Sequence, residues 1–497
     1  MARELLTEGK YDEARKAAEQ ALRFNPVSPE AESLAGQAEL ALDHTDQAQR
    51  HLERALALQP SAVDARRALG KVFLRRGLFN KAQVEFEDIL SSQPGDFFSR
   101  YSLGICFVRQ RRLAEALREF QEAYRVNSSD PALLLALLDT YIGLHEIRQA
   151  SATLAELNGR LTNQPGQRMQ IAALLVKESA YSLAAEEFER LTAANPDSDE
   201  LKYDLALAYY RAGEETQASM VLKNMLAADD DAELEDLLGD VEERAQNHAA
   251  ALVAFRRAMQ LGPQNEEYRF DYAQCLENQW DLAAAADVFQ AGVLDFPSSA
   301  KMWLGLGATY YLAGRYSQAA QSLLKAARIA PGAPEVYRLL GLAYEAAGPF
   351  QKRIADRFSR YLISNPPDAP AHYYYAKILI ERNQQAEAQS LTEARRELEQ
   401  AIKLDPNLAE AHGELGVLLS MQGQFHAACG QLQRAVRLDP ESSAAYYELS
   451  RTYRKLGENG HAQDALREFQ RLKATQRRKL DQDAVRSFLA RAKHEDP

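Results

Sequence analysis

The chain has 497 residues and a formal net charge of −12, with 71 acidic and 59 basic side chains. It contains no apolar run of about 18 residues, which argues against a transmembrane helix. Its first residues, Met-Ala-Arg-Glu-Leu-Leu, lack the apolar core of a signal peptide. We therefore expect a soluble protein, in the cytoplasm or in the periplasm.

Prolines recur at a fixed spacing along the chain. Intervals of 34 residues separate neighbouring members of three series, which are Pro26–Pro60–Pro94, Pro263–Pro297–Pro331 and Pro406–Pro440. A fixed period of this size predicts an array of structural repeats rather than a set of ordinary domains.

Each period carries two apolar stripes with helical spacing. In the unit that starts at Ala300, the first stripe is Trp303, Leu306, Gly307 and Tyr310, and the second is Ala319, Leu323 and Ala326. A glycine between the stripes recurs as Gly77, Gly213, Gly314, Gly423 and Gly457, which predicts the end of a first helix. The proline that follows the second stripe ends a second helix. One helical hairpin cannot bury both stripes, so neighbouring units must stack.

This pattern resembles the tetratricopeptide repeat (TPR) family over nearly the whole chain. The resemblance implies an all-α fold, a solenoid of helix-turn-helix units stacked into a right-handed superhelix. It also implies that partners bind in a groove lined by the first helices. Bacterial cell-envelope and polysaccharide-export assemblies contain similar arrays.

The first unit is incomplete. Counted back from Pro26, Met1 falls inside a first helix, so we interpret the start as trimmed or matured, with an unusual natural start as the alternative. A signal peptide or a further domain upstream of Met1 is therefore left open. The open edge of the first unit also makes self-association plausible.

Basic side chains occupy groove positions of the next units, with aromatic residues beside them. The predicted basic groove consists of Arg67, Lys71, Arg75, Phe98, Tyr101 and Arg109. It is a candidate site for an acidic segment or a phosphate, with ordinary solvated surface as the alternative.

The middle of the array is strongly acidic. Residues 197–243 hold fifteen acidic and three basic side chains, so this segment alone carries the net charge of the whole chain. The predicted acidic groove consists of Glu200, Tyr203, Asp204, Tyr210, Glu233, Asp236, Asp240, Glu243, Glu267, Phe270, Asp271 and Glu277. A partner that carries Lys and Arg would relieve the repulsion among these acids, and the aromatic rings could stack on Arg. A solvated acidic face that aids solubility is the alternative.

Turn formers and extra residues interrupt the period at a few places. Turn formers cluster between Asn158 and Gly166, and the unit that ends at Pro406 is six residues too long, with the excess near 384–392. We expect a lengthened helix or a protruding loop there. The predicted parts are an N-terminal subarray over 1–164, a central subarray over 165–367, a C-terminal subarray over 368–480, and a capping helix and tail over 481–497.

The C-terminal subarray carries a second candidate surface. Its predicted aromatic-basic patch consists of Tyr373, Tyr374, Tyr447, Arg451, Arg454 and Lys455. Beyond it, Val485, Phe488, Leu489 and Ala492 form the apolar face of a helix that would cover the open end of the stack. The preceding Arg477-Arg478-Lys479 is explained by a solvated capping helix, and nucleic acid is not an expected partner.

Several specific functions find no support in the sequence. Asp229-Asp230-Asp231 and Glu233 lack the glycine and the distal glutamate of a calcium loop, and Cys106, Cys275 and Cys429 have no metal-ligand spacing. No phosphate loop, dinucleotide fingerprint, nucleophile elbow or zinc helix occurs. We expect neither a cofactor nor a metal.

Two binding modes of the TPR family are also not expected here. In the chaperone-binding clamp, Lys, Asn and Arg come from three consecutive units, whereas Arg67 and Lys71 are followed by Ser102 and then by Ala132 and Ala136. The asparagine ladder of the family's glycosyltransferases is missing as well.

The sequence thus predicts a non-catalytic scaffold or adaptor that binds a protein segment in its groove. The preferred partner is a basic segment at the acidic middle. The alternative is that the chain is the TPR portion of a larger protein, either a cell-envelope or polysaccharide-export assembly or an enzyme whose catalytic domain is not in this sequence.

Overall fold

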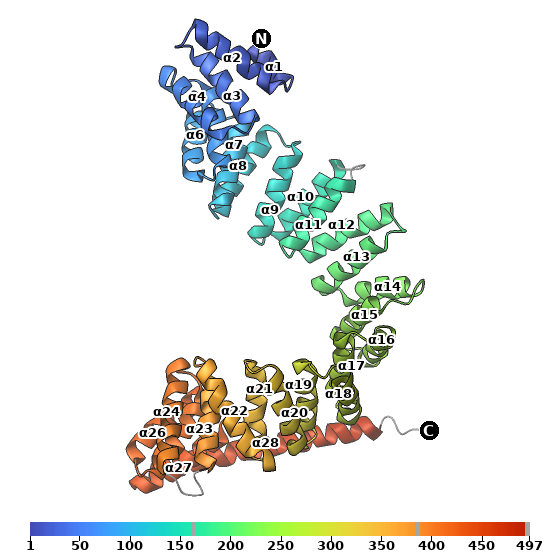
Figure 1. Ribbon diagram of the computed structural model, residues 1–497, viewed down its shortest axis with the longest axis vertical. Coiled ribbons are helices and arrows are strands. Elements are labelled where there is room, and N and C mark those ends of the chain that lie inside the picture. Colours follow the sequence, from blue (N-terminus) through green and yellow to red (C-terminus); the bar gives the residue numbers. More distant parts are fainter. Residues whose placement is uncertain (161–164, 383–387, 493–497) are drawn as a thin grey trace. The chain divides into compact units, whose positions relative to one another are not determined.

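In the computed structural model, residues 1–160, 165–382 and 388–492 are described, without the side chains of 388, 389 and 476–492. The described residues form helices and no strand (Figure 1). The first helices of the repeats are α1 (Ala2–Thr7), α3 (Pro29–Ala41), α5 (Val63–Arg75), α7 (Phe97–Arg109), α9 (Pro131–Gly143), α11 (Pro165–Lys177), α13 (Asp199–Ala212), α15 (Ala232–Arg244), α17 (Glu266–Asn278), α19 (Ala300–Leu312), α21 (Pro334–Ala343), α23 (Ala369–Arg382), α25 (Ala409–Met421) and α27 (Ser443–Leu456).

The second helices alternate with the first along the chain. They are α2 (Tyr11–Phe24), α4 (Thr45–Leu58), α6 (Phe79–Ser92), α8 (Leu113–Val126), α10 (Ile147–Arg160), α12 (Tyr181–Ala194), α14 (Glu215–Leu226), α16 (His248–Leu261), α18 (Leu282–Asp295), α20 (Tyr316–Ile329), α22 (Gln351–Ser364), α24 (Ala388–Leu404), α26 (Phe425–Leu438) and α28 (Asn459–Ala492). A short 3-10 helix, Gly348–Phe350, precedes α22. The predicted all-α solenoid of stacked hairpins is confirmed.

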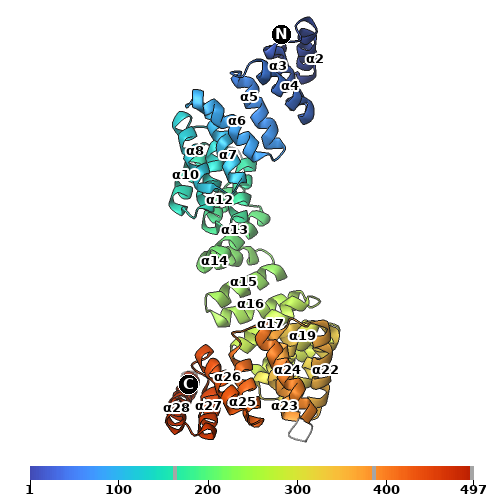
Figure 2. The same ribbon diagram turned by 90° about the vertical axis from the view of Figure 1, so that its left-hand side faces the viewer.

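Each repeat is a hairpin whose two helices pack together, and within each compact unit most hairpins pack against the next one in the chain (Figure 2). Within a repeat, a glycine of the first helix faces a large apolar side chain of the second. A Cβ on Gly70 would lie 2.6 Å from the ring of Phe86, and a Cβ on Gly307 would lie 2.6 Å from Leu323 Cγ. The small residue is therefore needed to let the helices approach.

Two devices recur at the starts of the described first helices. A Ser, Asp or Asn at the N-cap accepts a hydrogen bond from a backbone N–H of the first turn, as Asp96 does from Ser99 at 2.8 Å. A donor side chain one turn further on bonds to the carbonyl of the preceding inter-repeat proline. The donor–carbonyl pairs are Arg66–Pro60, Arg100–Pro94, Trp303–Pro297, Tyr337–Pro331, His372–Pro366 and His412–Pro406. This second device, which the sequence pattern did not reveal, ties each of these first helices to the turn before it.

The glycines predicted to end first helices do so. Gly77, Gly213, Gly314, Gly423 and Gly457 all have positive φ. In other repeats the same conformation is held by larger residues, which are Asp43, Arg111, His145, Ser179, Gln246 and Trp280. Non-glycine residues adopt this region at a cost, so these turns store strain.

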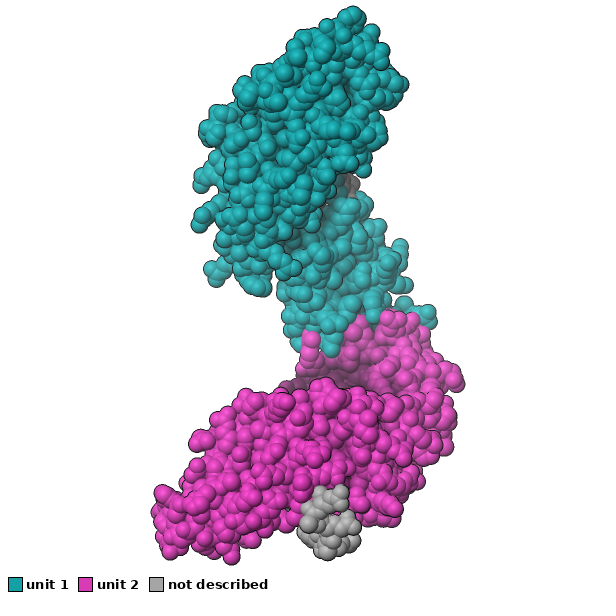
Figure 3. Space-filling model, turned by 60° about the vertical axis from the view of Figure 1, so that its left-hand side comes forward, with its two compact units in different colours: residues 1–229 teal, residues 230–497 magenta. Residues whose placement is uncertain are grey.

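The chain divides into two compact units, Met1–Asp229 and Asp230–Pro497 (Figure 3). The boundary lies inside the predicted central subarray, and the predicted subarray limits stay predictions. The excess residues near 384–392 fall partly in α24, which has 17 residues where most second helices have 14, while 383–387 lie outside the described residues. Residues 481–492 of the predicted capping helix continue α28. The side chains of its apolar face and the tail 493–497 lie outside the described part.

Candidate functional site

The predicted acidic groove is shared between the two compact units. Glu200, Tyr203, Asp204 and Tyr210 lie on α13 in the first unit, and the remaining residues lie on α15 and α17 in the second. On α13, burial and then the charge of Glu200 raise the pKa of Asp204. The two parts are therefore separate candidate surfaces.

Four acids of the second unit form one cluster, which we call the central acid cluster. It consists of Asp236, Asp240, Glu267 and Asp271, from α15 and α17. Burial, followed by the charges of Asp271, Asp240 and Glu267, raises the pKa of Asp236 to about 7. Burial also raises the pKa of Asp271 to about 6, although Lys301 opposes this shift. The acids thus lie close enough to repel one another, because each disfavours ionisation of its neighbours.

One lysine enters this cluster from the next repeat. Lys301, on α19, pairs with Glu267 and lies over the ring of Phe270, with Nζ 4.2 Å from the ring centroid. Phe270 in turn packs edge-on against Phe289, at 5.5 Å between centroids. A carboxylate beside an aromatic face is an arrangement that holds a cationic side chain.

Two other acids predicted for this groove accept hydrogen bonds from neutral side chains. Glu243 accepts a hydrogen bond from Asn278 Nδ2 at 2.5 Å, and Glu277 accepts one from Thr309. Burial raises the pKa of Glu277, although the hydrogen bond from Thr309 opposes this shift. Glu233 lies in the first turn of α15, where it also interacts with another group of the chain. These residues extend the acidic surface on either side of the central acid cluster.

Three residues of the predicted basic groove line a real depression. Arg67, Lys71 and Arg75 lie on one side of α5 and line a groove of about 1200 Å³ together with residues of α1 and α3. Arg67 pairs with Asp64 at 3.0 Å and Asp96 at 2.9 Å, and Arg75 pairs with Asp43 at 3.0 Å. Their charges are therefore largely compensated within the chain.

Lys71 differs from its two neighbours because no carboxylate pairs with it among the described residues. Its Nζ lies 4.2 Å from the centroid of Phe98, and burial, then the charges of the two arginines, lowers its pKa. Tyr101 stacks on Phe97, and Arg109 lies at the far end of α7, where its charge acts on Asp139. Arg109 does not line the groove.

The predicted aromatic-basic patch consists of two separate parts. Tyr373 and Tyr374 lie on α23, whereas Tyr447, Arg451, Arg454 and Lys455 lie on α27, and α25 packs between these helices. The ring of Tyr447 packs against that of Phe469 in the same repeat, with 5.2 Å between the ring centroids. Arg451 pairs with Glu448 at 3.0 Å.

The surroundings of Tyr373 and Tyr374 are acidic rather than basic. Burial, followed by the charges of Glu414 and Glu410, raises the pKa of Tyr373. Nearby, Lys377 pairs with Glu345 at 2.6 Å, and burial together with Glu345 raises the pKa of Glu381. We call Glu345, Glu381 and Glu414 the second acid cluster. Sequence analysis missed it because its members are spread over α23, α25 and the segment after α21 rather than concentrated in one stretch.

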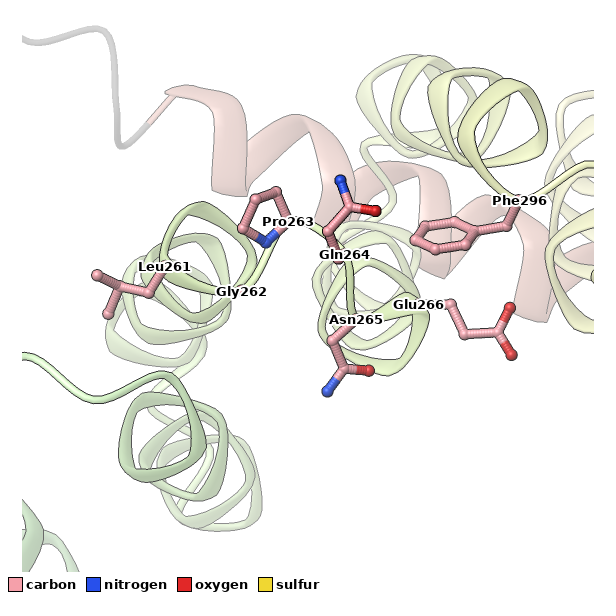
Figure 4. A pocket seen from close by; sticks show the side chains of 7 residues that line it. All are labelled: Leu261, Gly262, Pro263, Gln264, Asn265, Glu266 and Phe296. Carbon is pink, nitrogen blue, oxygen red and sulfur yellow. The ribbon is translucent and has the colours of Figure 1, made fainter.

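The described residues contain no group of three potential metal ligands and no helix that could span a membrane. The cysteines are free and buried, and His372 and His412 are buried with hydrogen bonds to Glu397 and Gln431. An open depression of about 770 Å³ lies at the turn before α17 (Figure 4), lined by Leu261, Gly262, Pro263, Gln264, Asn265, Glu266 and Phe296. Its lining holds one acid and no nucleophile, so it offers no catalytic set.

Comparison with known families gives a consistent result along the chain. A family model described as "Tetratricopeptide repeat" matches residues 1–43, 33–96, 68–132, 237–293, 281–334 and 420–478, which is more than half of the chain. Further models described as "TPR repeat" and "Tetratricopeptide repeat" match residues 383–423 and 175–241.

Two curated proteins are similar over part of this chain. Protein O-mannosyl-transferase TMTC1 of Homo sapiens is 24% identical over 166 residues, covering 32% of this chain and 19% of that protein. Anaphase-promoting complex subunit 3 of Schizosaccharomyces pombe is 27% identical over 178 residues, covering 34% of this chain and 25% of that protein. The chain thus spans a quarter or less of these relatives.

Solved structures with a similar fold include two that match most of this chain. The crystal structure of the APC/C hetero-tetramer Cut9-Hcn1 has a TM-score of 0.34 and 14% identity, over 91% of this chain and 95% of that chain. The crystal structure of yeast Tom70 has a TM-score of 0.35 and 15% identity, over 94% of this chain and 99% of that chain.

Proposed function

Since the chain belongs to the tetratricopeptide repeat family, we propose that it is a non-catalytic scaffold that binds a segment of another protein on its first helices. The partner segment is basic and docks on the second compact unit. Its Lys and Arg side chains lie against the central acid cluster and the second acid cluster. The aromatic rings of Phe270, Tyr373 and Tyr374 hold its apolar stems.

The position of Lys301 is the observation that carries this proposal. Its ammonium group pairs with Glu267 and lies on the face of Phe270, so the chain itself contains one example of the contact expected from a partner. Asp236 and Asp271 keep raised pKa values although Lys301 lies beside them. Further cations are therefore favoured on this surface.

The second acid cluster supports a partner that is extended along the first helices. Like the central acid cluster, it contains one paired lysine, since Lys377 pairs with Glu345, and it has acids with raised pKa values, Glu381 and Glu414. Both clusters belong to the second compact unit. A single extended or helical basic segment with cations at two places would use both.

The experiment is a binding titration of the full chain with a fluorescent Lys-rich peptide, read by anisotropy at low and high salt. The test variant carries Asp240→Asn, Glu267→Gln and Asp271→Asn, which remove charge and keep shape. We expect it to bind at least about tenfold more weakly than wild type, with a smaller salt dependence.

The matched control neutralises three exposed acids of second helices, with Glu87→Gln, Asp287→Asn and Asp464→Asn. It loses the same formal charge and should bind nearly as wild type does. Equal losses in both triple variants would mean that the peptide senses net charge alone, and the proposed site would be wrong.

A second possibility is that the chain is the repeat portion of a larger protein, such as an enzyme or a cell-envelope assembly. It is supported by the two curated relatives, because the matched regions make up only 19% and 25% of the lengths of those proteins. The genomic sequence on both sides of the coding region tests this possibility directly. A neighbouring reading frame in phase that encodes a further domain would support it, and in-frame stop codons on both sides would contradict it.

A further inference from the structure

A basic pocket lies between two second helices of the second compact unit, away from the residues that form the proposed partner site. It has a volume of about 230 Å³ and is lined by Lys325 and Arg328 of α20 and by Arg353, Arg357 and Arg360 of α22, with Leu324 and Asp356. Five cations therefore surround one small cavity beside a single acid. In a chain whose net charge is −12, such a concentration is unusual.

The helices place these cations on facing sides. Arg353, Arg357 and Arg360 follow the spacing i, i+4, i+7 along α22, so they share one face. Lys325 and Arg328 are three residues apart on α20, which packs against α22. Leu324 and Phe358 are buried between the helices, so the two rows of cations are fixed by the packing beneath them.

None of the five cations has an anionic partner in the part of the chain that the structure describes. No ion pair or side-chain hydrogen bond joins them to any described residue, whereas Arg269 of the same compact unit pairs with Asp295. Lys325 lies 5.9 Å from the ring centroid of Trp303, and Arg353 lies 5.7 Å from that of Phe350. Like charges gathered without a counter-charge repel one another, and a bound anion would relieve this repulsion.

We propose that this pocket binds a phosphate-bearing anion. Four guanidinium groups offer many N–H donors in planar forks, and phosphate groups present three strong acceptor oxygens each at high charge density. The volume of about 230 Å³ equals that of roughly eight water molecules at about 30 Å³ each, which is enough for a short run of phosphate groups. Carboxylates spaced along a peptide would place less charge in the same volume.

The test is isothermal titration calorimetry of the full chain with sodium tripolyphosphate at constant ionic strength. Wild type should show saturable binding of one anion per chain. The variant Arg353→Gln with Arg357→Gln should bind at least about tenfold more weakly, because two charge-assisted contacts are lost. The matched control, Arg434→Gln with Arg437→Gln on α26, removes the same charge elsewhere and should stay within about twofold of wild type.

Three results would overturn the proposal. These are the absence of saturable binding by wild type at millimolar tripolyphosphate, equal losses in the test and control variants, and equal affinity for citrate, which carries carboxylates alone. Circular dichroism checks that the variants are folded. If the first pair proves unfolded, Arg328→Gln with Arg360→Gln, both at exposed positions, should give the same loss.

Discussion

At the scale of single residues, the glycines of the first helices are the tightest constraint. A Cβ on Gly307 would lie 2.6 Å from Leu323 Cγ and 3.4 Å from the Leu323 backbone nitrogen. Because the leucine is fully buried, it has little room to move. We expect Gly307→Ala to lower the free energy of unfolding by about 1–3 kcal/mol, measured by chemical denaturation.

A glycine with open space around it is the control for that substitution. No atom lies within 4 Å of a Cβ added at Gly430, in the middle of α26. Gly430→Ala should leave stability unchanged or raise it by up to about 1 kcal/mol, because alanine favours helix. Equal destabilisation by both substitutions would contradict close packing at Gly307.

Asp236 makes stability depend on pH. Its pKa is about 7 in the folded chain and 3.8 without the fold, so the folded state holds its proton more tightly. Its contribution to stability is therefore greatest below about pH 4 and is lost as pH rises through 7. At pH 8, Asp236→Asn should raise stability by on the order of 1–3 kcal/mol and raise the melting temperature.

The gain should shrink when the melting temperature is measured at pH 4 to 5, where Asp236 is protonated in the folded chain. The exposed Asp287 provides the control, since Asp287→Asn should change stability by less than about 0.5 kcal/mol at either pH. A gain for Asp236→Asn that is independent of pH would point to a cause other than this ionisation.

At the scale of helices, the break predicted near Asn158–Gly166 contains a buried polar link. Glu187 of α12 is fully buried and contacts Asn158 of α10, Arg168 of α11 and Arg190 of its own helix. Arg168 Nη1 lies 3.2 Å from a carboxylate oxygen of Glu187 and 2.8 Å from Asn158 Oδ1. Three successive helices are thus joined by one carboxylate.

Removing that carboxylate should therefore loosen these three helices. We expect Glu187→Ala to cost about 3–5 kcal/mol, because Arg168 would be left half-buried without its partner. The neighbouring Glu186, which is exposed and 3.9 Å from Arg190, provides the control, with an expected cost below about 1 kcal/mol for Glu186→Ala. Hydrogen exchange should localise the effect of Glu187→Ala to α10–α12, and protection unchanged there would refute the link.

At the scale of the whole chain, the repeat fold was predictable because its signals are local. The stripe of Leu306 and Gly307 and the turn glycine Gly314 recur at fixed offsets, and each offset has one physical meaning. Groupings across repeats were less predictable, because they depend on how far one hairpin turns relative to the next. Tyr373 and Tyr447, for example, lie on first helices that are separated by α25, so whether they serve one partner stays a prediction.

The same limit explains why the role of Lys301 was missed. Counting acids in a stretch of sequence finds the central acid cluster, but it does not reveal that a lysine of the next hairpin lies among them. Its ring contact with Phe270 joins residues 31 positions apart. Electrostatic balance on the first-helix surface is thus a property of stacked repeats rather than of any one segment.

Lys301 is expected to stabilise the fold and to weaken peptide binding, and one substitution can measure both effects. Lys301→Met keeps the length of the side chain and removes its charge. Asp236 and Asp271 would then lose the cation that lowers their pKa values, so we expect a lower melting temperature at pH 8. The vacated place on Phe270 and Glu267 should at the same time bind a Lys-rich peptide more tightly, by about two- to tenfold.

The opposite signs distinguish this role from a structural one. A lysine that only supports the fold would weaken both properties when replaced, so weaker peptide binding by Lys301→Met would contradict the proposed site. Lys403→Met, at an exposed position without an ion pair among the described residues, removes the same charge and should change neither the melting temperature nor peptide affinity beyond the small effect of net charge. Anisotropy titrations and thermal melts of the two variants, at equal ionic strength, decide between these roles.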